Sequence, residues 1–131
     1  MELDLDFVLH LRIGALVNYR NLEVYKLAVR FLPVAAKISR AMPTGYGSFA
    51  EQLRRASLSI SINIAEGSGK TTRPDQRRYY AISRGSAMEC AAIIDACVVL
   101  GFVPDEEARL ALEILDSVVR MLSRMILPAD T

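Results

Sequence analysis

Four segments of the chain carry apolar residues at the three- and four-residue spacing of an α-helix. The clearest is 103–127, which repeats at that spacing through Ala108, Ala111, Leu112, Leu115, Val118, Val119, Leu122, Met125 and Ile126. Pro104 suits the first turn, where its missing N–H costs nothing, and Pro128 ends the pattern. The spacing therefore predicts a helix over 103–127.

Two further helices are predicted over 21–41 and 74–101. The second begins at Pro74 and Asp75 and ends at Gly101, with an apolar second half that is typical of a central bundle helix. The first can be capped by Asn21. Pro33 lies inside it and is expected to kink or split the helix, because proline has no backbone N–H to donate.

The fourth segment, 48–66, is ambiguous at first sight. Ser48 and Glu51 have capping-box spacing, which predicts a helix start near Ser48. Its end reads ASLSISINIAEGSGK, in which apolar residues and Ser or Asn alternate as on a strand. A lone strand in a helical chain would have no pairing partner, so we predict a helix ending in a glycine cap at Gly67 and Gly69. Its second apolar stripe contains Leu58, Ile62 and Ala65.

The same stretch resembles a phosphate-binding loop only in part. The motif G-x-x-x-x-G-K-[ST], ending at Gly69-Lys70-Thr71, requires glycine at position 64. That position is Ile64, and no βαβ pattern follows. The sequence therefore does not support nucleotide binding here.

Composition indicates one globular domain with uneven charge. The chain has 131 residues, of which 52% are apolar and 24% charged, and its net charge is only +1. However, residues 19–42 carry +4, residues 70–78 carry +3 and residues 103–131 carry −3. Such asymmetry is typical of complementary subunit faces or of a nucleic-acid surface.

The cysteines and the chain start indicate a cytoplasmic protein without a membrane span. Cys90 and Cys97 are two helical turns apart, too far for a mutual disulfide and wrongly spaced for a zinc pair, so we expect reduced core residues. The start MELDLDFVLHLR lacks the basic region of a signal peptide. The most apolar run, 90–103, is too short to cross a bilayer.

Four stretches of the chain form an ordered set of motifs: YRNLEVYKLA (19–28), YGSFAEQLRRASLSISINIAEGSGK (46–70), RYYAISRGSAMEC (78–90) and LGFV (100–103). Together they resemble the S23, or 23S rRNA intervening-sequence, protein family. The chain departs from the family pattern at Ser61-Ile62, at Lys70 and at Pro33. Residues 1–18 fall outside the resemblance.

The resemblance implies an all-α fold, a left-handed up-and-down four-helix bundle over 19–131 that assembles as a ring, commonly a homopentamer. It implies no known enzyme activity. A related group assists reverse transcriptases and binds nucleic acid, so RNA or DNA is an expected partner. We expect no catalytic residues, no metal and no cofactor, because one histidine and no G-x-S-x-G motif leave little scope for nucleophilic catalysis.

A polar cluster is predicted where two helices meet. Asn63 and Glu66 share one helix face, and so do Ser86 and Glu89. Arg55 or Arg84 could neutralise these carboxylates. We interpret the group as a buried cluster that fixes helix register; the alternative is a metal or small-ligand site using Glu66 and Glu89.

The candidate binding surface is the basic turn that precedes and begins the predicted helix 74–101. It contains Lys70, Arg73, Arg77, Arg78, Tyr79 and Tyr80. Cations beside aromatic rings suit phosphate contact and base stacking. The alternative is a solvated helix start whose arginines pair with acids of the C-terminal helix.

Residues 1–18 are predicted to form an N-terminal arm. Nine of them are large and apolar: Leu3, Leu5, Phe7, Val8, Leu9, Leu11, Ile13, Leu16 and Val17. Such a segment is too apolar for a free tail. We expect it to pack on an outer groove or on a neighbouring subunit, with its acids Glu2, Asp4 and Asp6 near the basic faces, and to strengthen assembly.

Overall fold

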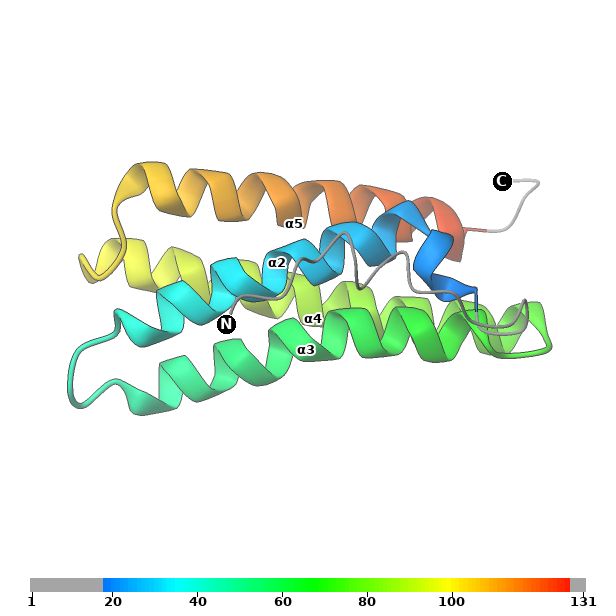
Figure 1. The fold of residues 1–131 in the computed structure, drawn as a ribbon, viewed down its shortest axis with the longest axis horizontal. Coiled ribbons are helices and arrows are strands. Elements are labelled where there is room, and N and C mark those ends of the chain that lie inside the picture. The colour runs from blue at the N-terminus through cyan, green and yellow to red at the C-terminus, as the bar shows by residue number, and fades with distance from the viewer. Residues whose placement is uncertain (1–17, 128–131) are drawn as a thin grey trace.

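The computed structural model describes residues 18–127 and folds them into four long helices (Figure 1). After a 3₁₀ turn, η1 (Tyr19–Asn21), come α2 (Glu23–Arg40), α3 (Gly47–Ser68), α4 (Arg73–Val99) and α5 (Asp105–Ile126). The predicted all-α four-helix bundle is confirmed. The predicted arm lies outside the described residues except for Asn18.

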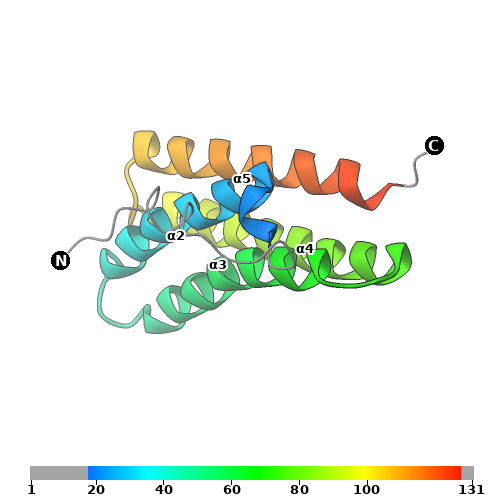
Figure 2. The same ribbon diagram turned by 45° about the vertical axis from the view of Figure 1, so that its right-hand side comes forward.

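The four helices run up and down in chain order around one core. Helix α2 packs on α3 and α5, and α4 packs on the same two helices, so that α2 and α4 are diagonal to each other. One end of the bundle holds η1, the α3–α4 connection and the end of α5; the other holds the α2–α3 and α4–α5 connections (Figures 1 and 2). This topology decides which charged segments lie together.

The core is filled by the helical stripes that the sequence shows. Its largest fully buried side chains are Phe31, Ile38, Leu53, Ile60, Ile64, Ile94, Leu115, Leu122 and Val118. Cys90 and Cys97 are free thiols within it, and burial raises the pKa of Cys90 to about 12. Within residues 18–127, no helix combines the length and apolar character needed to cross a membrane.

Two predicted helix starts are wrong in detail. Neither Ser48 nor Asn21 caps a helix: Tyr46 and Leu22 hold the N-cap positions of α3 and α2, without a side-chain capping bond. The Tyr46 ring packs edge-on against Phe49 and Phe102, with centroids 5.4 and 4.5 Å away. Aromatic packing therefore fixes the entry to α3, and capping chemistry does not.

The glycines of α3 also differ from the prediction. Gly67 lies inside the helix, and Gly69 holds the C-cap position with φ −86°, so neither forms a left-handed cap. Gly101 does form one after α4: its φ is +79°, and the N–H of Phe102 donates to the carbonyl of Cys97 at 2.8 Å. The end predicted for α4 is thus confirmed to within two residues.

Pro33 does not split α2, which runs unbroken from Glu23 to Arg40. The proline ring is exposed, whereas Phe31 and Ala35 on either side are fully buried. Packing of these neighbours holds the helix together despite the lost backbone hydrogen bond.

Candidate nucleic-acid interface and the α3–α4 polar seam

The predicted basic turn lies at the end of the bundle where α4 begins. Lys70 is in the α3–α4 connection, and Arg73, Arg77 and Arg78 occupy the first two turns of α4. Thr72 caps the helix by accepting from the N–H of Asp75 at 3.3 Å. Gln76 ties the turn to the helix by donating to the carbonyl of Lys70 at 3.1 Å.

The tertiary structure adds further cations to this end. Because α5 finishes and α2 begins here, four more basic side chains belong to the same end of the bundle: Arg20, Lys26, Arg120 and Arg124. Two of them are ion-paired within their own helices, Lys26 with Glu23 at 3.3 Å and Arg120 with Asp116 at 2.9 Å. We call these four together with Lys70, Arg73, Arg77 and Arg78 the basic end. The sequence alone groups only Lys70, Arg73, Arg77 and Arg78, because the cations of η1, α2 and α5 are distant from them along the chain.

The arginines of α4 do not pair with acids of α5, as the alternative interpretation supposed. The ion pairs of α5 in the described residues are internal, such as Arg120 with Asp116 at 2.9 Å, apart from Lys37 with Glu107 at 4.0 Å. Arg73 donates instead to the amide oxygen of Gln76 at 3.2 Å. The positive charge at the start of α4 is therefore not neutralised by α5.

The two tyrosines of the turn have different environments. Tyr79 is half-buried, with the Lys70 Nζ 4.7 Å and the Arg78 Cζ 5.7 Å from its ring centroid. Tyr80 is only 5% exposed, and burial raises the pKa of its phenol. Tyr79 can contribute to a binding surface. The assignment of Tyr80 to that surface is wrong, because its ring belongs to the core.

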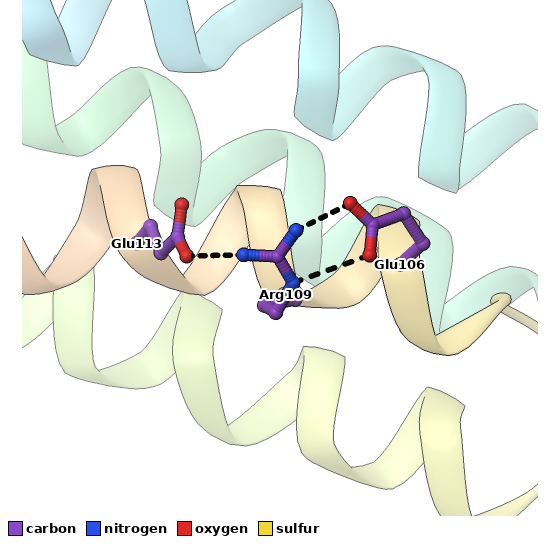
Figure 3. Close-up of polar contacts among 3 residues, drawn as sticks. All are labelled: Glu106, Arg109 and Glu113. Atoms are coloured by element: carbon purple, nitrogen blue, oxygen red, sulfur yellow. Dashed lines mark hydrogen bonds and ion pairs between the residues drawn. The ribbon is translucent and has the colours of Figure 1, made fainter.

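Acidic side chains gather at the opposite end, where α5 begins. Arg109 donates to Glu106 through Nε at 3.2 Å and to Glu113 through Nη1 at 2.7 Å (Figure 3). The bond to Glu106 raises the pKa of Arg109. All three side chains are solvent-exposed, so the pairs contribute little stability.

A groove of about 810 Å³ between α4 and α5 continues from this acidic region. Its apolar part includes Val98, Val99 and Leu112, and Val99 is 85% exposed. The acids that line it are Asp95, Asp105, Glu113 and Asp116. The start of α5 and this groove are therefore acidic, whereas Lys37 and Arg40 in the last turn of α2 place positive charge at the same end of the bundle.

The predicted polar cluster is a seam of hydroxyl and amide groups between α3 and α4. Asn63 donates to the carbonyl and the Oγ of Ser59, at 2.8 and 3.0 Å, and the Ser59 and Ser86 hydroxyls bond each other at 2.8 Å. Ser83, fully buried, donates to the carbonyl of Ile60 at 2.8 Å. Asn63 and Ser86 are thus brought together, through Ser59.

The carboxylates predicted for the cluster are not buried in it. Glu66 and Glu89 are both exposed. Glu89 lines a 400 Å³ cavity with Arg55 and Ser59, whereas Glu66 lines a groove between α2 and α3. Arg84 bonds the Ser123 hydroxyl of α5 at 2.8 Å and neutralises neither. The two carboxylates stay hydrated at the protein surface, and the buried part of the α3–α4 seam is formed by uncharged hydroxyl and amide groups.

The metal or ligand alternative is not favoured by this arrangement. Glu66 and Glu89 line different cavities, so they do not form one site. Across residues 18–127, no three side chains among His, Cys, Asp and Glu are grouped as metal ligands would be. The sequence did not single out Ser59, Ser83 and Ser123, because their bonds join different helices and give no local signal.

The sequence profile of the 23S rRNA-intervening sequence protein family matches residues 20–124. The chain belongs to this family. The match covers α2, α3, α4 and all but the last two residues of α5, and it leaves out the predicted arm. The family description names a genetic element within ribosomal RNA and no enzymatic activity. Comparison with curated proteins gives no significant match.

Proposed function

We propose that the chain is a non-enzymatic, oligomeric scaffold that binds RNA or DNA through its basic end. The observation that supports this most strongly is the convergence of cations from η1, α2, the α3–α4 connection, α4 and α5 on one end of the bundle. Phosphate contacts from such a surface supply affinity without sequence selectivity. Tyr79, partly exposed among Lys70 and Arg78, offers a ring for base stacking.

The scaffold is proposed to be a homo-oligomer, a pentamer by family resemblance. Large apolar side chains of α4 are exposed on the isolated subunit: Ile82, Met88 and Val99. Exposed apolar surface on this scale is typical of subunit contacts. Repetition of the basic end around an assembly would multiply weak phosphate contacts through avidity. The free, buried thiols suit the reducing cytoplasm, where we place the assembly.

Nucleic-acid binding is tested by reversing charge at either end of the bundle. The test variant is Arg77→Glu with Arg78→Glu; the matched control is Lys37→Glu with Arg40→Glu, at the opposite end and with the same change in net charge. Binding of fluorescein-labelled single-stranded RNA and DNA is measured by anisotropy from 50 to 300 mM salt.

We expect the Arg77/Arg78 variant to lose roughly tenfold or more in affinity. The slope of log K against log salt should also fall by about 1.4–1.8, corresponding to two lost phosphate contacts. The control variant should bind like the unmodified protein. Equal losses in both variants, or none in either, would contradict binding at the basic end.

Assembly is tested separately by multi-angle light scattering at micromolar concentration. We expect a mass several times that of the 14.5 kDa chain. Met88→Glu should reduce that mass by placing a charge in a subunit contact, while Glu51→Gln, on the exposed start of α3, should not. A monomeric unmodified protein would contradict the oligomer.

A further inference from the structure

An apolar groove runs between α2 and α3 on the outer surface of the bundle. It has a volume of about 350 Å³. Its apolar lining comes from Tyr19, Tyr25, Val29 and Leu32 on one side and from Leu58 and Ile62 on the other. Leu58 is 49% exposed and Ile62 44% exposed, so neither is covered by the described residues.

The groove begins where the chain enters the bundle. Tyr19, the second described residue, is part of its lining, and the Tyr19 ring packs edge-on against Tyr25 at 4.8 Å between centroids. Helices α2 and α3 lie side by side from this point in both views (Figures 1 and 2). The chain that precedes Asn18 therefore adjoins the open end of an apolar groove.

We propose that residues 3–17 of the same chain occupy the α2–α3 groove. Nine of these residues are large and apolar, so burying them in the groove removes two exposed apolar surfaces from water at once. Fifteen residues extend about 22 Å as a helix and about 50 Å as a strand. The α2 side of the groove, from Tyr25 to Leu32, is about 10 Å long at 1.5 Å per residue, so a segment in either conformation is long enough to span it.

The charges of the two partners are complementary in this direction. Glu2, Asp4 and Asp6 lie at the start of the chain, farthest from Asn18. If the segment follows α2 along the groove, these acids reach the part of α2 from Arg30 to its end, which carries Arg30, Lys37 and Arg40 and no acid. Opposite charge thus fixes the direction, and apolar burial supplies the stability.

Docking in the same subunit is favoured over docking in a neighbour. The segment leaves the bundle at the groove itself, so the covalent connection gives a high effective concentration at that site. The α3 stripe of Leu58 and Ile62 is then covered by the chain itself, and α4 supplies the subunit contacts. The inference does not depend on nucleic-acid binding or on the size of the oligomer.

Photo-crosslinking of the full chain tests the proposal. A benzoylphenylalanine is placed at position 62 and, as the matched control, at position 82, because Ile62 and Ile82 are 44% and 42% exposed. Light and ¹⁵N-labelled proteins are unfolded and refolded together, irradiated, and digested for mass spectrometry. We expect position 62, and not position 82, to crosslink to peptides from residues 3–17 of the same isotope.

The other outcomes would overturn the proposal. Mixed light–heavy crosslinks to residues 3–17 would place the segment in a neighbouring subunit's groove. Crosslinks from position 62 that miss residues 3–17 would show that another surface covers the groove. Neither result bears on binding at the basic end, so the two ideas fail separately.

Limited trypsin cleavage after Arg12 provides an independent measurement. A docked segment protects this bond, so Ile62→Asp should speed its cleavage at least tenfold while helical circular dichroism is unchanged. Leu110→Asp, at a side chain of α5 that is 51% exposed and lies outside the proposed subunit contacts, should leave the rate as in the unmodified protein. Equal cleavage rates in all three proteins would refute docking.

Discussion

Gly67 is the position at which the structure makes its sharpest stability prediction. It lies in the last turn of α3 and is buried against the start of α4. A Cβ at this position would lie 2.7 Å from Cε1 and 2.9 Å from Cδ1 of Tyr80, and 3.1 Å from the Cβ of Tyr79. The perturbation is therefore Gly67→Ala, the addition of one methyl group.

The expected magnitude is a balance of two opposing effects. Alanine in a helix interior is more favourable than glycine by about 1 kcal/mol. Against this, the Tyr80 ring must move by roughly 0.7 Å to reach an ordinary contact of 3.4 Å, and overpacking of this kind costs about 1–3 kcal/mol. Since Tyr80 is only 5% exposed and has little room to move, we expect a net destabilisation of up to about 2 kcal/mol.

Gly85→Ala is the matched control. Gly85 also lies inside a helix, α4, but a Cβ there meets nothing within 4 Å. This variant should gain up to about 1 kcal/mol from helix propensity alone. Urea unfolding followed by circular dichroism at 222 nm suits a chain without tryptophan, at one fixed protomer concentration.

The reasoning would be refuted if Gly67→Ala were as stable as Gly85→Ala. The opposite signs of the two changes are what the close approach of Tyr80 requires. A second check is Gly67→Ala combined with Tyr80→Leu, because a smaller residue 80 should make the added methyl tolerable. If the double variant shows no coupling between the two sites, the Tyr80 contact is not the cause.

Three further predictions concern single side chains. Pro33→Ala should raise the free energy of unfolding by about 1–3 kcal/mol in urea titration, because α2 regains a backbone donor; a decrease would contradict this. Asn63→Ala should lower the free energy of unfolding by about 0.5–1.5 kcal/mol, because it removes the hydrogen bonds to Ser59. Glu66→Ala removes an exposed side chain and should change that free energy by less than about 0.5 kcal/mol. Equal effects of the two substitutions would contradict this prediction. Burial raises the pKa of the Cys90 thiol and keeps it neutral in the folded protein. Its contribution to the free energy of unfolding is therefore complete below about pH 9 and is lost between pH 9 and 12, by about 1.4 kcal/mol per pH unit. Cys90→Ala should weaken this loss of stability in urea unfolding curves measured from pH 7 to 11.

The predicted buried cluster is thus corrected at Glu66. The sequence places Asn63 and Glu66 on one helix face, which is true of the structure. It does not show how far that face is buried. The amide of Asn63 finds hydrogen-bond partners in the α3–α4 seam, while the Glu66 carboxylate stays in water.

The candidate binding surface, too, could be recognised only in part from the sequence. Lys70, Arg73, Arg77 and Arg78 were recognisable because they are close along the chain. The contribution of α5 to the basic end could not be recognised, because it depends on α5 finishing beside the start of α4. Tyr80 looked identical to Tyr79 in the sequence, yet a one-residue step turns a helix by about 100° and takes its ring into the core.

The sequence by itself determined the four helices of this protein, because apolar spacing of three and four residues is a local property of the backbone. It also resolved the alternating stretch 57–64 as helix, since a lone strand would have lacked a partner. Only the tertiary structure decided the role of Gly67, because the need for glycine comes from the Tyr80 ring on the next helix. Likewise, the entry to α3 is fixed by packing of Tyr46 against Phe102, a contact between residues far apart in the chain that outweighs local capping chemistry.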